Sequence, residues 1–344
     1  MSTPRSSSPS GSDASRGPRQ DATPRSSYPA IARPAVAALG GGHGLAASLQ
    51  ALQLVTDKIT AIVTVADDGG SSGRLRDEFD ILPPGDLRMA LAALCDTSEW
   101  GLQWRDALQH RFAGDGPLGG HALGNLIIAS LWDLLGDPVA GLDLVGRLLG
   151  ARGRVLPMAG EPLRIEASVL GADPSRPHEV VDVIGQVEVA TARGRVQSVR
   201  LHPDPPAPCL PAVEAVQRAD WVILGPGSWY SSVMPHLLVP DLCQALVHTD
   251  ARKMLTLNMM RHDGETQDFS ASDYLDVLTA HAPELRLDVV LADVTVDGEE
   301  ADLLATAAER LGARVVRAPV ADTDIPGTHD PLRLAAAYRD VLDA

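Results

Sequence analysis

The sequence is poor in lysine and cysteine and has no long apolar run. Lys58 and Lys253 are its only lysines, and each precedes a strand-like apolar run, which argues against Schiff-base chemistry. The cysteines Cys95, Cys209 and Cys243 form no C-x-x-C pair and are odd in number, which favours a reducing compartment over a disulfide framework or a zinc site. No apolar run reaches the ~18 residues of a membrane-spanning helix.

The first 33 residues differ in composition from the rest of the chain. They consist mainly of Ser, Pro and Arg without apolar periodicity, so we predict a disordered tail at 1–33 and a single α/β domain at 34–344. A targeting peptide is disfavoured because the segment lacks an apolar core and contains Asp13 and Asp21. The tail has net charge +3, so the formal −16 of the chain leaves −19 on the domain, which disfavours nucleic acid and anionic membranes as partners.

Short apolar runs alternate with helical patterns along the domain, which predicts βαβ units and a mostly parallel sheet. The expected strands lie at 35–39, 59–66, 221–225, 254–258, 287–294 and 314–320. The stretch 154–202 instead contains alternating or β-branched segments without helical spacing. We predict that it forms an antiparallel, β-rich insertion between the two halves of the parallel sheet.

The segment "VAALGGGHGLAASL" (36–49) leads from an expected strand through a glycine-rich turn into an expected helix. Such a turn presents free backbone N–H groups at a helix N-terminus, where the partial positive charge favours phosphate. Leu45 stands where the G-x-G-x-x-G dinucleotide motif needs Gly or Ala, and no Gly-Lys-Ser/Thr of a P-loop follows. A merely tight strand-to-helix turn is the alternative to an anion site. We expect His43 to donate to a bound anion.

The second expected strand ends in "VADDGGSSGRLRDEF" (65–79), which we interpret as a ligand-binding loop. Asp67 and Asp68 follow the glycine turn by about twenty residues, where an acidic residue of nucleotide-binding sheets takes ribose hydroxyls. The paired carboxylates would alternatively hold Mg²⁺ beside phosphates. Arg74 lies within reach of a phosphate. A solvated loop ahead of a charged helix start is the competing interpretation.

Four further segments place polar residues beside glycines or at strand ends, at 83–95, 119–132, 222–232 and 255–266. Together with the first two, they indicate one crevice at the carboxyl ends of the strands. The candidate binding residues are Gly41, Gly42, His43, Gly44, Asp67, Asp68, Gly69, Gly70, Ser71, Ser72, Arg74, Asp86, Arg88, His121, Asn125, Gly225, Gly227, Ser228 and Asn258. No Ser nucleophile elbow and no clustered metal-ligand spacing is present, so we assign no catalytic residue.

Several segments in this order resemble the gluconeogenesis factor YvcK family, relatives of the 2-phospho-L-lactate transferase CofD. They are "GGGHGL", "ITAIVTVADDGGSSGRLR", "PPGDLR", "GHALGN", "RGRVLPM", "ADWVILGPGSWYSSVMPHLL" and "GET". The resemblance covers about residues 34–342. His43 stands where many members have Thr and Ala122 where Ser is usual, which leaves hydroxyl contacts there in question.

The resemblance implies a Rossmann-like α/β fold, a cytoplasmic bacterial location and binding of UDP-sugars such as UDP-N-acetylglucosamine. It also implies a role in carbon-source use, cell shape and cell-wall integrity, without an established catalytic activity. We therefore expect a regulatory protein that binds a nucleotide sugar. The resemblance does not identify its regulatory partner, and a homo-oligomer is compatible with it. An enzyme of phospholactate-transferase type is the alternative. An NAD-dependent oxidoreductase is a weaker alternative, because Leu45 breaks the glycine spacing of the dinucleotide-binding motif.

Overall fold

The computed structural model describes residues 33–259, 265–266 and 269–344, so the predicted tail lies outside the described residues except for Arg33. Its main element is a parallel sheet of seven strands in the order β10-β9-β8-β7-β1-β2-β3. The strands are β1 (Val36–Gly40), β2 (Ile59–Val63), β3 (Arg154–Pro157), β7 (Trp221–Leu224), β8 (Arg252–Thr256), β9 (Val289–Asp293) and β10 (Arg314–Ala318). The six strands predicted for the parallel sheet are confirmed.

The order of the main strands is that of a doubly wound sheet. Strand β1 pairs with β2 on one side and with β7 on the other, so successive strands are added in opposite directions from β1. Every residue of β1, β7 and β9 is buried, as expected for parallel strands covered on both faces. The predicted Rossmann-like α/β fold is therefore confirmed, and the reversal of strand order lies between β1 and β7.

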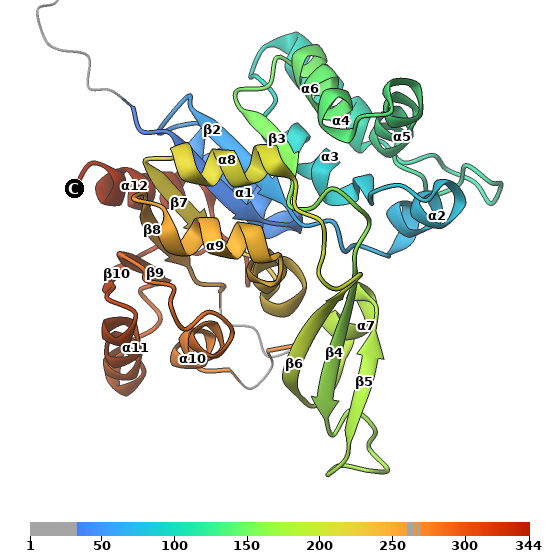
Figure 1. Ribbon diagram of the computed structural model, residues 1–344. Helices are drawn as coiled ribbons and strands as arrows, with labels where there is room; N and C mark the ends of the chain where they lie inside the picture. The colour runs from blue at the N-terminus through green and yellow to red at the C-terminus, as the bar shows by residue number, and fades with distance from the viewer. Residues whose placement is uncertain (1–32, 260–264, 267–268) are drawn as a thin grey trace, which may run out of the picture. The chain divides into compact units, whose positions relative to one another are not determined.

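Helices cover both faces of the main sheet because right-handed crossovers on the two sides of β1 lie on opposite faces. Figure 1 shows α8 and α9 crossing in front of the strands. Helix α12 returns to pack on α1, where the Tyr338 hydroxyl is 2.9 Å from Ser48 Oγ and 3.1 Å from Thr256 Oγ1. The helices around this sheet are α1 (Gly42–Leu52), α3 (Pro84–Ala93), α4 (Glu99–Gln109), α5 (Leu123–Leu135), α6 (Pro138–Leu149), α8 (Leu210–Arg218), α9 (Pro240–His248), α10 (Ala271–His281), α11 (Gly298–Arg310) and α12 (Pro331–Leu342).

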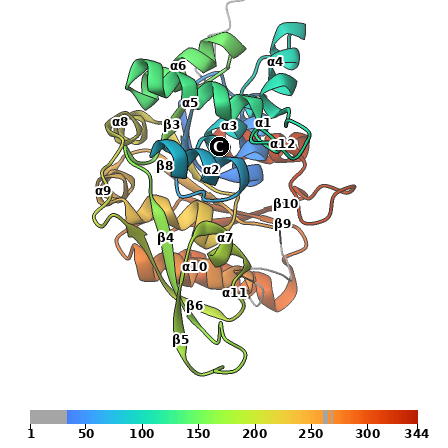
Figure 2. The ribbon, with the colours of Figure 1, turned by 90° about the vertical axis from the view of Figure 1, so that its right-hand side faces the viewer.

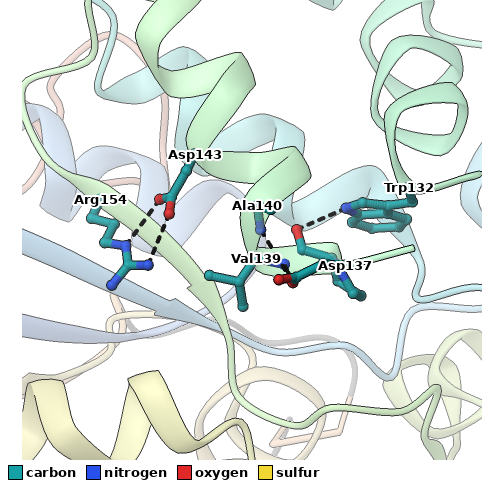
Figure 3. Close-up of polar contacts among 7 residues, drawn as sticks. Trp132, Asp137, Val139, Ala140, Asp143 and Arg154 are labelled. Carbon is teal, nitrogen blue, oxygen red and sulfur yellow. Dashed lines mark hydrogen bonds and ion pairs between the residues drawn. The ribbon is translucent and has the colours of Figure 1, made fainter. Parts of the chain in front are cut away.

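Strand β3 belongs to the main sheet and not to the insertion, so the predicted boundary at residue 154 is wrong. Residues Arg154–Pro157 pair in parallel with β2. The Arg154 guanidinium donates to both carboxylate oxygens of Asp143 on α6, at 2.8 and 2.9 Å (Figure 3). The turn that precedes α6 is held by Trp132, whose Nε1 donates to the Pro138 carbonyl at 2.9 Å. The sequence of β3 is short and ends in proline, as is typical of an edge strand. Such a sequence fits either sheet, so it did not show to which sheet β3 belongs.

The insertion is a separate antiparallel sheet in the order β5-β4-β6. Its strands are β4 (Arg164–Leu170), β5 (Val180–Ile184) and β6 (Arg195–His202). Residues Gln186–Thr191, which we predicted as extended, form the short helix α7 instead. Figure 2 shows α7 beside the small sheet, at the end nearer the main sheet. The two ends of the insertion meet, because Ala159 and Pro208 form a β-bridge and Gly160 N–H donates to the Ala207 carbonyl at 2.9 Å.

Most of the segment that we interpreted as a ligand-binding loop after β2 is helical. Helix α2 (Gly70–Phe79) begins inside the GGSSG sequence, with Gly69 at its N-cap. Ser71, Ser72 and Gly73 are buried in its first turn. Within the residues that the structure describes, no helix combines the length and hydrophobicity that a membrane crossing requires.

Candidate functional site

The two glycine-rich segments that follow β1 and β7 lie in contact at the reversal of strand order. A Cβ on Gly44, in the first turn of α1, would lie 2.7 Å from the Pro226 carbonyl carbon and 2.8 Å from Gly227 Cα. Only a residue without a side chain allows this approach of α1 to the turn after β7. Gly42 has a φ of +58° and no atom within 4 Å of a Cβ position, so its backbone borders open space. The two turns therefore approach each other closely at this point of the sheet.

Asn258, which follows β8, fixes the turn after β7. Its side-chain oxygen accepts from Gly227 N–H at 2.7 Å, and its amide nitrogen donates to the Gly227 carbonyl. An amide is suited to this contact because it offers one acceptor and two donors. Gly225 lies behind with a φ of +71°, and Ser228 is exposed at the start of the π-helix η1 (Trp229–Val233), which continues into η2 (Met234–Leu238). Asn258 thus positions the backbone of the turn.

Asp86, in the first turn of α3, lies directly behind the first glycine turn. Its carboxylate accepts from Gly42 N–H, and its Oδ2 lies 2.6 Å from where a Cβ on Gly41 would stand. Burial, helped by the nearby charge of Asp67, raises the pKa of Asp86 to about 7. The hydrogen bond from Gly42 and the charge of Arg88 act in the opposite direction. Asp86 is therefore a carboxyl that exchanges its proton near neutral pH.

A cleft of about 1190 Å³ opens over these turns. Of the candidate residues, it is lined by Gly41, Gly42, His43, Gly44, Asp86, Gly227, Ser228 and Asn258. The remaining candidates do not line it: Asp67, Asp68, Gly69, Gly70, Ser71, Ser72, Arg74, Arg88, His121, Asn125 and Gly225. The cleft is thus built from the ends of β1, β7 and β8 together with the start of α3. The segment after β2 lies beside it.

The start of α2 and the start of α5 form a buried polar cluster beside the cleft. Ser71 Oγ is 3.0 Å from His121 Nδ1 and accepts from Asn125 Nδ2 at 2.9 Å. His121 and Asn125, predicted to share one face, therefore meet through a common serine. Burial lowers the pKa of His121, which keeps its imidazole neutral at pH 7. Ser72 bonds Asp67, whose pKa is raised by burial and whose Oδ1 accepts from Gly69 N–H at 2.9 Å.

Asp68 contacts the insertion and does not line the cleft. Its two carboxylate oxygens accept from the backbone N–H groups of Gln186 at 3.0 Å and Val187 at 3.2 Å. These are the first amides of α7, whose N-cap residue, Gly185, has no side chain to cap the helix. Arg74 is similarly engaged, since its Nη2 donates to the Gly119 carbonyl at 2.8 Å. Both side chains organise neighbouring segments.

Arg88 is a buried cation behind the cleft. It is 4% exposed, and its Nε and Nη1 have no hydrogen-bond partner among the described residues. Burial lowers its pKa to about 10, while Asp86 and Asp67 favour its charged form. Nowhere in the described ranges do three or more His, Cys, Asp and Glu side chains gather as metal ligands. Because Asp67 and Asp68 are bonded to different backbone segments, they are not arranged as a free chelating pair for Mg²⁺.

Two regions that we did not predict, together with the predicted segment 255–266, complete the cleft. The insertion contributes Gln186, Ala190, Thr191, Ala192 and Arg193, and the segment after β10 contributes Ile325, Gly327, Thr328 and His329. Glu265 and Thr266 come from the chain after β8, where Glu265 is 7% exposed and accepts from Tyr230 N–H at 2.9 Å. Burial raises the pKa of Glu265 to about 7. The "GET" segment was a signal for Glu265, but no local pattern marked the insertion residues.

A doubly wound sheet with a cleft at its reversal point and two glycine turns in backbone contact defines an α/β protein whose cleft lies where open sheets of this class commonly bind ligands. The sequence comparisons give the family. The model of the family described as 2-phospho-L-lactate transferase CofD matches residues 36–321, and the chain belongs to this family. A Mycobacterium tuberculosis protein is 51% identical over 310 residues, which cover 89% of this chain and 90% of that protein.

Two relatives named gluconeogenesis factor are also similar over most of their length. The Halalkalibacterium halodurans protein is 39% identical over 264 residues, covering 77% of each chain. The Bacillus subtilis protein is 37% identical over 261 residues, covering 76% of this chain and 79% of that protein. A crystal structure of a UPF0052 family member from Bacillus halodurans has a TM-score of 0.76 at 33% identity, covering 90% of this chain and 99% of that one. The fold described above is therefore shared with a solved relative.

Proposed function

We propose that the chain is a cytoplasmic regulatory protein that binds a nucleotide sugar of the UDP-N-acetylglucosamine type in the cleft. The observation that carries the proposal is the contact of two glycine turns under a cleft of about 1190 Å³. Ligand pockets commonly measure about 300–1,000 Å³, so this cleft has room for a large ligand. In the first turn of α1, which lines the cleft, Gly42 N–H is bonded to Asp86, but the N–H groups of His43 and Gly44 have no i−4 carbonyl partner inside the helix, and phosphates bind such groups.

The biological role is proposed from the relatives. Two of them are named gluconeogenesis factor, which supports a function in growth on gluconeogenic carbon sources. The family resemblance of the motifs extends this role to cell shape and cell-wall integrity. The unpaired state of Cys95, Cys209 and Cys243 fits a reducing compartment.

A transferase is the alternative function, and the family description is the observation that favours it. The CofD model covers 36–321, which includes every part of the cleft except the segment Ile325–His329. In that case the cleft would hold a nucleotide-activated substrate, and the glycine turn would bind the phosphates of the leaving group. We assign no catalytic residue, because a reaction here would require an acceptor whose position no contact defines.

The test is a thermal shift with UDP-N-acetylglucosamine, with GDP and NAD as comparison ligands. A ligand present at a hundredfold its dissociation constant stabilises the folded state by about 2.7 kcal/mol, which raises the melting temperature by several degrees in a domain of this size. We expect this shift with the UDP-sugar and its recovery intact after long incubation. Absence of a shift with every UDP-sugar would overturn the ligand. Release of UDP, or product formed from a GDP-activated substrate and a deazaflavin acceptor, would favour the transferase.

A further inference from the structure

The cleft contains little positive charge of its own. Among its described lining residues, the charged side chains are Asp86, Glu265 and Arg193. The two carboxyls are partly protonated near neutral pH because burial raises the pKa of each to about 7. The domain has a net charge of −19, which repels a ligand that carries phosphates unless a local cation binds it. Among the described residues that line the cleft, Arg193 is the one that offers a guanidinium.

Arg193 stands in the turn between α7 and β6. Its side chain is exposed, and it makes no hydrogen bond or ion pair with the residues that the structure describes. The next residue, Gly194, has a φ of +107°, and a Cβ there would lie 2.9 Å from the Gly171 carbonyl carbon. The turn is therefore closely packed at Gly194, which fixes the point from which the Arg193 side chain leaves the backbone.

The other arginines near the site and on the insertion do not line the cleft, and these include Arg164 and Arg195 on the small sheet. Arg74 donates to loop carbonyls, and Arg88 is buried behind the cleft without lining it. On the small sheet, Arg176 pairs with Asp173 and Glu179, and Arg200 pairs with Glu166. Arg193 combines three properties that none of these has together: it lines the cleft, it is accessible, and its donors are unused.

We propose that Arg193 is the specificity-determining residue that binds the phosphate groups of the ligand. The proposal rests on the proposed function and names the residue that selects a phosphorylated ligand over a neutral one. A guanidinium offers up to five N–H donors in a planar fork and binds phosphate oxygens in bidentate fashion. The phosphates then lie between Arg193 on the insertion and the N–H groups of the first turn of α1, both of which line the cleft.

The insertion is held in place by the segment after β2. Asp68 accepts from the first two amides of α7, and a Cβ on Gly69 would lie 3.1 Å from Val187 Cγ2. Helix α7 has only six residues, so the turn with Arg193 follows closely on the N-terminus that Asp68 holds. Asp68 is therefore a positioning residue that places Arg193 across the cleft without touching the ligand.

The experiment compares Arg193→Gln and Arg193→Lys with the wild type by calorimetric titration with UDP-N-acetylglucosamine, UDP and uridine. Arg176→Gln is the matched control, because it removes the same charge from the same insertion outside the cleft. We expect Arg193→Gln to weaken binding of both phosphorylated ligands about 10- to 100-fold. Arg193→Lys should fall between it and the wild type. Arg176→Gln should bind normally, and weak uridine binding should be the same in all variants.

The dependence on salt provides a second measurement. If Arg193 contacts phosphate, the affinity of the wild type for UDP should fall more steeply with ionic strength than that of Arg193→Gln. Equal affinities of Arg193→Gln and the wild type would overturn the role of Arg193 and leave the proposed function standing. An equal loss in Arg176→Gln would assign the effect to net charge and also overturn it. A wild type that binds neither UDP nor the UDP-sugar would overturn the proposed function together with this inference.

Discussion

Replacing Asp68 should release the insertion from the segment after β2 while the main sheet stays intact. In Asp68→Ala, the N–H groups of Gln186 and Val187 lose both carboxylate oxygens, which they contact at 3.0 and 3.2 Å. In Asp68→Asn, one oxygen remains and the amide nitrogen faces the other N–H group. We therefore expect a larger effect from Asp68→Ala than from Asp68→Asn.

The magnitude follows from the helix that Asp68 caps. Removing a capping side chain costs ~0.5–2 kcal/mol, and a carboxylate at a helix N-terminus adds ~0.3–1 kcal/mol. A six-residue helix has no stability of its own in water, so this loss acts on local opening of α7. A loss of about 1–2 kcal/mol corresponds to a 5- to 30-fold larger open population. The amides of 185–193 should exchange hydrogen faster by that factor in Asp68→Ala.

Hydrogen exchange followed by mass spectrometry measures this prediction, with peptides from β1 and β7 as internal references. Asp57→Asn is the control, because Asp57 is exposed and makes no hydrogen bond with other described residues. Unchanged exchange of 185–193 in Asp68→Ala would refute the capping role. A loss of ligand affinity without faster exchange would instead support the direct ribose contact that we predicted from the sequence.

Three further predictions address the cleft and the tail. Gly42→Val should abolish binding of the UDP-sugar, whereas the control Gly298→Val should not. Both glycines begin a helix with a similar positive φ (+58° and +54°), and at both a Cβ would have no neighbour within 4 Å. Equal affinities of the two folded variants in a titration would place the ligand elsewhere. The pKa values of Asp86 and Glu265, raised to about 7, mean that the folded state binds more protons than the unfolded chain, so their contribution to stability falls as pH rises from about 4 to 7. An anionic ligand favours the same protonated forms, so its affinity should fall between about pH 6 and 8, and calorimetry in two buffers should detect proton uptake; equal affinities would exclude the linkage. From composition alone, deleting 1–30 should leave the melting temperature and ligand affinity unchanged, and a loss of either would show that the tail docks.

The sequence was sufficient for the central strands and for the glycine turns because both signals are local. An all-apolar run such as Trp221–Leu224 and a glycine with positive φ such as Gly42 express their structural reasons within a few residues. The errors arose where distant partners decide the structure. The segment "QVEVAT" has strand-forming residues, yet it is helical with a cap from Asp68, 118 positions earlier. Ser71 is buried in α2 because His121 and Asn125 bond to it.

The candidate site was likewise predicted only in its local part. The glycine turns, Asp86 and Asn258, chosen for their places at strand and helix ends, line the cleft or fix its backbone. Asp68 and Arg74 had the correct chemistry for a phosphate or ribose site, but their polar groups bind backbone amides and carbonyls. Arg193 was missed because a lone arginine in a turn has no distinguishing pattern until the insertion is placed over the cleft.

The meeting of the two ends of the insertion makes it a replaceable module. Ala159 and Pro208 form a bridge, so the chain leaves the main sheet and returns to it at one place. A longer, shorter or differently charged insertion can therefore be exchanged there without altering the register of β1, β2 or β7. Proteins with this fold can change the ligand that they recognise by varying this module, while the glycine turns under the cleft stay the same. Grafting the insertion of one family member onto another is consequently a direct route to exchanging their ligand preferences.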